Sequence, residues 1–148
     1  MIVTKGATVS TPQSLTLAAA APGIFARDGS GQGQGIVVDA AGKYVDASNP
    51  AAAGQVIVLY CTGLGEVTPS VATGAAASLT QLSRTTNPVS LTIGGVTAQV
   101  AFSGLAPGFV GLYQVNAVVP TGVAAGSQVP VVITSAGQSS APVTIAIK

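Results

Sequence analysis

The apolar residues of this chain come in short runs rich in Val, Ile, Leu and Thr, and these runs are bounded by Gly, Pro, Asn or Ser. Side chains branched at Cβ favour extended backbone, whereas Gly, Pro and Asn favour turns. Runs that recur about every 8–12 residues are typical of an all-β sandwich. The strands that we expect are Ile2–Thr4, Ser14–Ala18, Gly35–Asp39, Gln55–Thr62, Val89–Ile93, Thr97–Ser103, Leu112–Val119, Val129–Thr134 and Val143–Ile147.

Local signals add detail to this expectation. Gly94-Gly95 lies between two predicted strands, and a Gly-Gly pair in that place is typical of a two-residue hairpin. Ala136-Gly137 separates the last two predicted strands in the same way. The run Gln55–Thr62 is continuously apolar, which predicts a central strand buried on both faces. The segment Pro69–Pro88 is the longest connection, and we expect a loop there with at most a short helical turn.

The low charge of the chain excludes several classes of function. Only 6% of the 148 residues are charged, five of them basic, and there is no His. Five scattered cations cannot follow a phosphate backbone, so we expect no nucleic-acid binding. No apolar run is long enough to predict a membrane span. The first residues show no signal-peptide pattern, so an exported form would have lost its signal.

The two ends of the sequence repeat each other. Residues 2–12 recur as residues 132–142 at an offset of 130, and residues 15–18 recur as residues 143–146 at an offset of 128. One sandwich needs one closing hairpin, so we expect residues 1–20 to form an extra N-terminal hairpin that resembles the end of a preceding sandwich. Residues 21–148 then form the sandwich itself.

This spare hairpin suggests an assembly function. A charge-poor surface favours association, and sheet edges with few Lys accept added strands. A donor at one end and an acceptor at the other give head-to-tail contacts between copies. We expect Ile2–Ala18 to be the donor and the apolar face of Val129–Ile147 to be part of the acceptor. The expected contact residues are Ile2, Val3, Val9, Leu15 and Leu17 on the donor, and Val143, Ile145 and Ile147 on the acceptor.

Catalytic and metal-binding patterns are weak. The glycine-rich segment Asp28–Gly35 precedes a predicted strand rather than a helix, which argues against a phosphate loop. Asp28, Ser30 and Gln32 alternate like calcium ligands, but no second carboxylate follows at the required spacing. Cys61 stands alone in an apolar run, which predicts a buried structural thiol. We therefore expect no enzyme activity and no catalytic, cofactor or metal site.

Three tyrosines leave a second function open. Tyr44, Tyr60 and Tyr113 could form a flat aromatic platform for a sugar if they shared one face. The alternative to self-assembly is therefore an adhesin or carbohydrate-binding domain whose partners are surface glycans.

Several blocks also resemble a known family. They are Ala21–Phe25, Asn49–Ala52, Tyr60–Gly65, Val89–Val96 and Gly104–Asn116, the last being the most specific. Over residues 15–148 the chain resembles the uncharacterised C-terminal domain that recurs in large exported proteins of Acidobacteria, of the Solibacter type. The resemblance implies an immunoglobulin-like β-sandwich in the style of IPT/TIG domains, an extracellular or cell-surface location, adjacent immunoglobulin-like domains as partners, and no catalytic residues.

Overall fold

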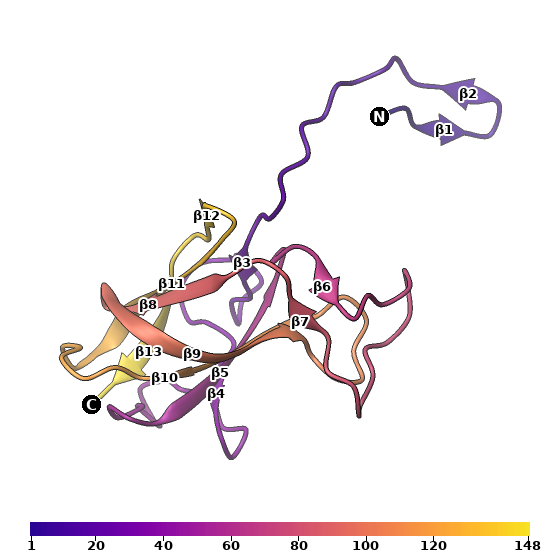
Figure 1. The fold of residues 1–148 in the computed structure, drawn as a ribbon. Helices are drawn as coiled ribbons and strands as arrows, with labels where there is room; N and C mark the ends of the chain where they lie inside the picture. The colour runs from indigo at the N-terminus through magenta and orange to yellow at the C-terminus, as the bar shows by residue number, and fades with distance from the viewer.

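The computed structural model describes residues 1–148 as an all-β protein without helices. Eleven antiparallel strands form one strongly curled sheet, and a separate two-stranded hairpin lies at the N-terminus (Figure 1). No helix capable of crossing a membrane is present. The prediction of an all-β chain with an extra N-terminal hairpin is confirmed.

The sheet follows the order β12-β11-β8-β9-β10-β5-β3, with β13 also paired to β11, β4 to β5, and β7 to both β6 and β9. The strands are β1 (Thr4–Lys5), β2 (Thr8–Val9), β3 (Gly23–Ile24), β4 (Val37–Asp39), β5 (Val56–Thr62), β6 (Val67–Thr68), β7 (Arg84–Thr85), β8 (Val89–Ile93), β9 (Val96–Leu105), β10 (Tyr113–Val118), β11 (Gly126–Ser135), β12 (Gln138–Ser139) and β13 (Val143–Ile147).

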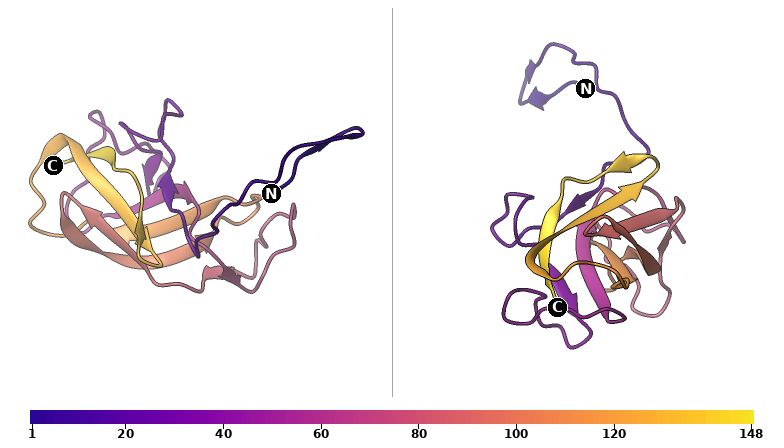
Figure 2. Two further views of the ribbon diagram at one scale, coloured as in Figure 1. Left: turned by 90° about the horizontal axis from the view of Figure 1, so that it is seen from above. Right: turned by 90° about the vertical axis from the view of Figure 1, so that its left-hand side faces the viewer.

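The long strand β9 makes the sheet curl. Its first residues pair with β8, and the rest pair with β10, where the register shifts between Asn116 and Ala117. A bulge of this kind bends a strand and increases its twist. The two halves of the sheet therefore fold toward each other around one core (Figure 2).

The core is built by alternating side chains from both halves. Ile57 and Leu59 of β5 are fully buried, as are Leu91 of β8 and Ile133 of β11. Successive side chains on a strand point to opposite faces, so the longer strands β5, β8, β10 and β11 contribute alternate residues to the core. The buried cluster consists of Ile24, Val37, Val45, Ala51, Ile57, Leu59, Cys61, Leu64, Leu91, Ile93, Ala98, Val115, Ala117, Val119, Val129, Val131, Ile133, Val143, Ile145 and Ile147.

The prediction that Gln55–Thr62 is buried on both faces is wrong. Val56 is 42% exposed, and Val58 and Tyr60 are half-buried. This strand is central in its half of the sheet, between β10 on one side and β3 and β4 on the other. The outer face of this strand is therefore partly open to solvent, whereas its inner face lies in the core.

Two predicted strands, Val89–Ile93 and Val143–Ile147, have the observed bounds. The hairpin at Gly94-Gly95 is also confirmed: Ile93 pairs with Val96, and both glycines have positive φ. Pro69–Pro88 holds β7 and no helix.

The predicted strand Ser14–Ala18 is wrong. The first hairpin closes at once through the two-residue turn Gly6-Ala7, so Lys5 pairs with Thr8. Its second strand, β2, therefore precedes Pro12, and residues 14–18 have no strand beside them.

The chain enters and leaves the body, residues 19–148, at opposite ends of β5. At the entry end, the Ala21 amide donates a 2.8 Å hydrogen bond to the Gly63 carbonyl, just after β5. At the exit end, the Lys148 amide donates to Ala51, which precedes β5. The N-terminal segment and the C-terminus thus lie at different ends of the body (Figure 2).

Candidate functional site: an exposed N-terminal arm

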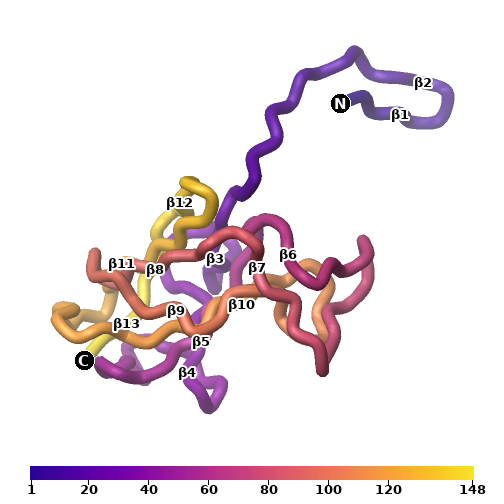
Figure 3. Tube along the Cα trace, viewed as in Figure 1, coloured from indigo at the N-terminus to yellow at the C-terminus, as the bar shows by residue number.

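Residues 1–18, called the arm below, extend away from the body (Figure 3). Every residue of the arm is exposed. Leu15 is 60% exposed and Leu17 is 91% exposed, and the other large apolar side chains of the arm, Met1, Ile2, Val3 and Val9, are also in solvent. The structure therefore presents all five predicted donor side chains without any partner in the chain.

The tip of the arm is a preformed hairpin. Thr4 pairs with Val9, and Gly6 in the turn has a φ of 60°. Beyond the strands, the Ser10 amide donates to the Val3 carbonyl at 2.9 Å, and the Val3 amide donates to Ser10 Oγ at 3.0 Å. These two bonds continue the hairpin by one further pair.

The closing hairpin of the body repeats this geometry. Thr134 pairs with Ser139, as Thr4 pairs with Val9, at the same offset of 130. The Ser140 amide donates to the Ile133 carbonyl at 2.8 Å, and the Ile133 amide donates to Ser140 Oγ at 3.1 Å. Ala136, in the place of Gly6, has a φ of 47° and is the only non-glycine residue with a positive φ. The repeat in sequence is thus a repeat in structure.

The predicted acceptor side chains are not on an open surface. Val143, Ile145 and Ile147 all lie in the core. The backbone of β13 is bonded along both edges as well: β11 pairs with one edge, and the Gly33–Gly35 segment and Ala51 bond to the other. A partner strand can reach these positions only if β13 leaves them.

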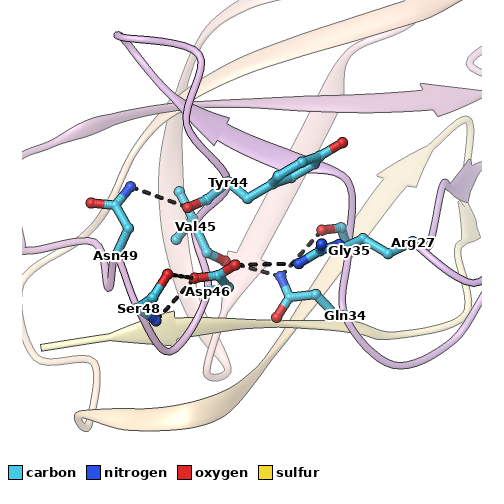
Figure 4. Close-up of polar contacts among 8 residues, drawn as sticks. All are labelled: Arg27, Gln34, Gly35, Tyr44, Val45, Asp46, Ser48 and Asn49. Carbon is cyan, nitrogen blue, oxygen red and sulfur yellow. Dashed lines mark hydrogen bonds and ion pairs between the residues drawn. The ribbon is translucent and has the colours of Figure 1, made fainter.

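A polar cluster lies beside this covered edge (Figure 4). The Arg27 guanidinium stacks 4.6 Å from the centre of the Tyr44 ring and pairs with Asp46 at 3.3 Å. Gln34 Nε2 donates to the Val45 carbonyl at 2.9 Å. Ser48 donates to the other Asp46 oxygen, and this bond holds the pKa of the carboxyl below its usual range. Both oxygens of Asp46 are therefore occupied in holding the loop.

A hollow of about 570 Å³ adjoins this cluster. Most of its lining residues are polar, and they come from four separate parts of the chain: Gly33, Gln34, Asp46, Ala47, Ser48, Ser127, Gln128 and Thr144. Uncharged amides and hydroxyls of this kind can bind the hydroxyl groups of a ligand.

The three tyrosines do not form a common platform. Tyr60 pairs with Gln114 and Tyr113 pairs with Cys61, so the two tyrosines point to opposite faces of the sheet. The Tyr113 hydroxyl donates to the Gly65 carbonyl, and burial raises its pKa. Tyr44 lies against Arg27. A flat aromatic sugar site of the predicted kind is therefore absent.

The remaining candidate groups serve local structure. The amide and hydroxyl of Ser30 both donate to Asp28, which lowers the pKa of that carboxyl, and Asn49 does the same for Asp39. No cluster of three or more metal-ligating side chains is found. The prediction of a buried Cys61 is confirmed, and burial raises the pKa of its thiol to about 12.

Sequence reasoning found the arm through the repeat, but it missed the polar hollow. The lining residues are far apart in the sequence and follow no motif. Comparisons of the chain with protein-family models, with curated proteins and with solved structures gave no match.

Proposed function

We propose that this protein is a non-catalytic structural module of the extracellular space or cell surface. It joins neighbouring copies, or adjacent immunoglobulin-like domains, head-to-tail by strand addition from the arm. The observation that carries this proposal is the exposed arm itself, a preformed hairpin followed by Leu15 and Leu17, with every large apolar side chain in water.

The energetics favour a partner for the arm. Burying an apolar side chain such as leucine contributes roughly 1.5–3 kcal/mol, and the arm carries six unburied large apolar side chains in Met1, Ile2, Val3, Val9, Leu15 and Leu17. An isolated two-stranded hairpin is marginally stable in water. Addition to a neighbouring sheet would satisfy the free backbone groups of the arm and bury its side chains together.

The placement of the two chain ends favours a head-to-tail arrangement. The arm leaves the body at the end where Ala21 meets Gly63, whereas Lys148 lies at the other end, beside Ala51. A contact made by unlike surfaces repeats from copy to copy, so it yields a filament or a closed ring.

The fold is proposed to be an immunoglobulin-like sandwich in the style of IPT/TIG domains. The support is the curled antiparallel sheet, in which β9 passes from the half that contains β8 to the half that contains β10. The resemblance to the exported domains of Acidobacteria supports the same fold and the extracellular location.

Electron microscopy and light scattering of the full chain test the assembly function. We expect concentration-dependent filaments or rings from the native chain and dispersed particles from the double variant Leu15→Asp, Leu17→Asp. The double variant Ser14→Asp, Thr16→Asp is the matched control, because it adds the same two charges at neighbouring exposed positions. Dispersed particles from the native chain at every concentration would refute the proposal.

The polar hollow favours a second candidate, a glycan-binding domain. Its lining amides and hydroxyls, including Gln34, Gln128 and Thr144, could accept and donate hydrogen bonds to sugar hydroxyls. A glycan array probed with the native chain and with Gln128→Ala tests this. Binding to a defined glycan that Gln128→Ala removes would support it, and an array without any binding would contradict it.

A further inference from the structure

We infer that the arm is a second copy of the closing element of this fold, residues 131–148, and that it fits the place of that element in another copy of the chain. This inference rests on the proposed function and names the acceptor: the edge of β8 that residues 131–135 cover, and the edge of the first half of β11 that β13 covers.

The hydrogen bonds of the arm hairpin and of the closing hairpin support this equivalence. The bonds between Val3 and Ser10 match those between Ile133 and Ser140 in donor, acceptor and offset. In the body, this hairpin continues β11, and the last five residues of β11 pair with β8. The first five residues of the arm correspond to that stretch.

The side chains after the hairpin support it as well. An offset of 130 places Leu15 at Ile145 and Leu17 at Ile147, whereas an offset of 128 places them at Val143 and Ile145. The two offsets differ by two residues, and a two-residue shift leaves every side chain of a strand on the same face. In either register both leucines take positions whose side chains point into the core, and Thr16 takes a position whose side chain points outward.

The residue types of the arm also match those of the place that β13 occupies. The β13 place takes apolar side chains at alternate positions, all of them in the core, and a proline just before the strand, Pro142. The arm has Pro12 at the matching point of its hairpin. No residue of the arm from Met1 to Ala18 is charged except Lys5, which lies next to the turn. At the offset of 130 Lys5 takes the place of Ser135, which is fully buried, so the gain from burying the apolar side chains of the arm is offset in part by the cost of placing one ammonium group at this end of β11.

In the native chain, residues 131–148 fill this place themselves. Occupation by the arm is thus an exchange of like elements, a low-cost route to association. Weakening β13 alone should shift the exchange toward the arm of another copy. Weakening the core elsewhere should not.

The test uses a fluorescent peptide of residues 1–18 and three full-length chains: native, Ile145→Ala and Leu59→Ala. Ile145 and Leu59 are both fully buried, on β13 and β5 respectively, so both substitutions weaken the fold to a similar degree. We expect the peptide to bind Ile145→Ala at least about tenfold more tightly than the other two chains. A peptide with Leu15→Asp and Leu17→Asp should not bind.

Equal binding to all three chains would place the acceptor elsewhere and overturn the inference. Absence of binding to Ile145→Ala, with native assembly that still depends on Leu15 and Leu17, would overturn the inference and leave the proposed function standing. If Ile145→Ala does not fold, Ile145→Val removes a single methylene and serves in the same comparison.

Discussion

The hydroxyl of Ser135 donates a 3.0 Å hydrogen bond to the backbone carbonyl of Leu64, a residue 71 positions away, and both residues are fully buried. The bond joins the end of β11 to the loop after β5, at the end of the body where the chain enters. A single hydroxyl thus connects the closing element to the segment that anchors the arm.

Removing this hydroxyl should lower the free energy of unfolding. Ser135→Ala leaves the buried Leu64 carbonyl without this donor, and an unsatisfied buried polar group costs about 1–3 kcal/mol. Urea unfolding of the variant should show a loss of this size. Ser127→Ala, at an exposed position of the same strand, should change stability by less than about 0.5 kcal/mol. Equal effects of the two variants would show that the bond is not formed in solution.

The repeated positions should respond differently to the same change. Ile145→Ala removes core volume and should destabilise the body by about 2–5 kcal/mol. Leu15→Ala, at the corresponding exposed position of the arm, should alter stability by less than about 0.5 kcal/mol while weakening assembly. Thermal unfolding of dilute samples measures the first effect, and light scattering of concentrated samples measures the second. A large loss of stability in dilute Leu15→Ala would mean that the arm packs on its own body.

Gly63 should tolerate no side chain. It has a φ of 72°, and an added Cβ would lie 2.0 Å from the Ala21 carbonyl oxygen. Gly63→Ala should therefore displace the entry segment, destabilise the protein and expose the junction near Ala21 to proteases. Gly122 is the control, because it has a φ of 86° but open space around its Cα. Gly122→Ala should show only the backbone cost, about 1 kcal/mol. Limited proteolysis at matched temperatures separates the two variants.

Cys61 should make stability fall at alkaline pH. Burial raises the pKa of its thiol from 9.0 to about 12. Between these values the folded state keeps a proton that the unfolded state has lost, so the free energy of unfolding decreases as pH rises. The contribution is fully present below pH 9.0 and is lost by about pH 12. Cys61→Ala should show a shallower decline over this interval, with the raised Tyr113 pKa still contributing.

A thiol reagent gives a second measurement on Cys61. In the native chain near neutral pH, an aromatic disulfide should react with Cys61 only after denaturant is added, because the thiol is buried and protonated. Fast reaction in the folded state would contradict both the burial and the raised pKa.

Local signals predicted the parts of the fold that depend on neighbouring residues. The turn at Gly94-Gly95 needs positive φ at both positions, so its place could be read directly from the sequence. The strand Val143–Ile147 could be predicted because its apolar run begins at once after Pro142. Ser14–Ala18 has the same kind of composition but no strand beside it, and composition alone cannot reveal a missing neighbour.

The remaining features depend on how the sheet curls. The outer exposure of Val56 and the burial of Ile145 follow from which face the curl encloses, and this is decided by pairings between distant strands. The exposed arm of the candidate site could be predicted from the sequence, but the covering of β13 could not. The repeat that links Ser10 to Ser140 is visible in the sequence. The hydrogen bonds on the second edge of β13 are made by Gly33–Gly35 and Ala51, which lie far from β13 in the chain.

The opposite placement of the two chain ends has a mechanical consequence. β13 runs from near the entry end toward Lys148, antiparallel to β11. In a string of modules joined through the arm, tension would therefore pull the strand that occupies the β13 place along its own axis. Its hydrogen bonds to β11 lie perpendicular to that axis, so they would bear the load together in shear instead of opening one after another. Modules connected in this way would need a high force to be pulled apart along the string.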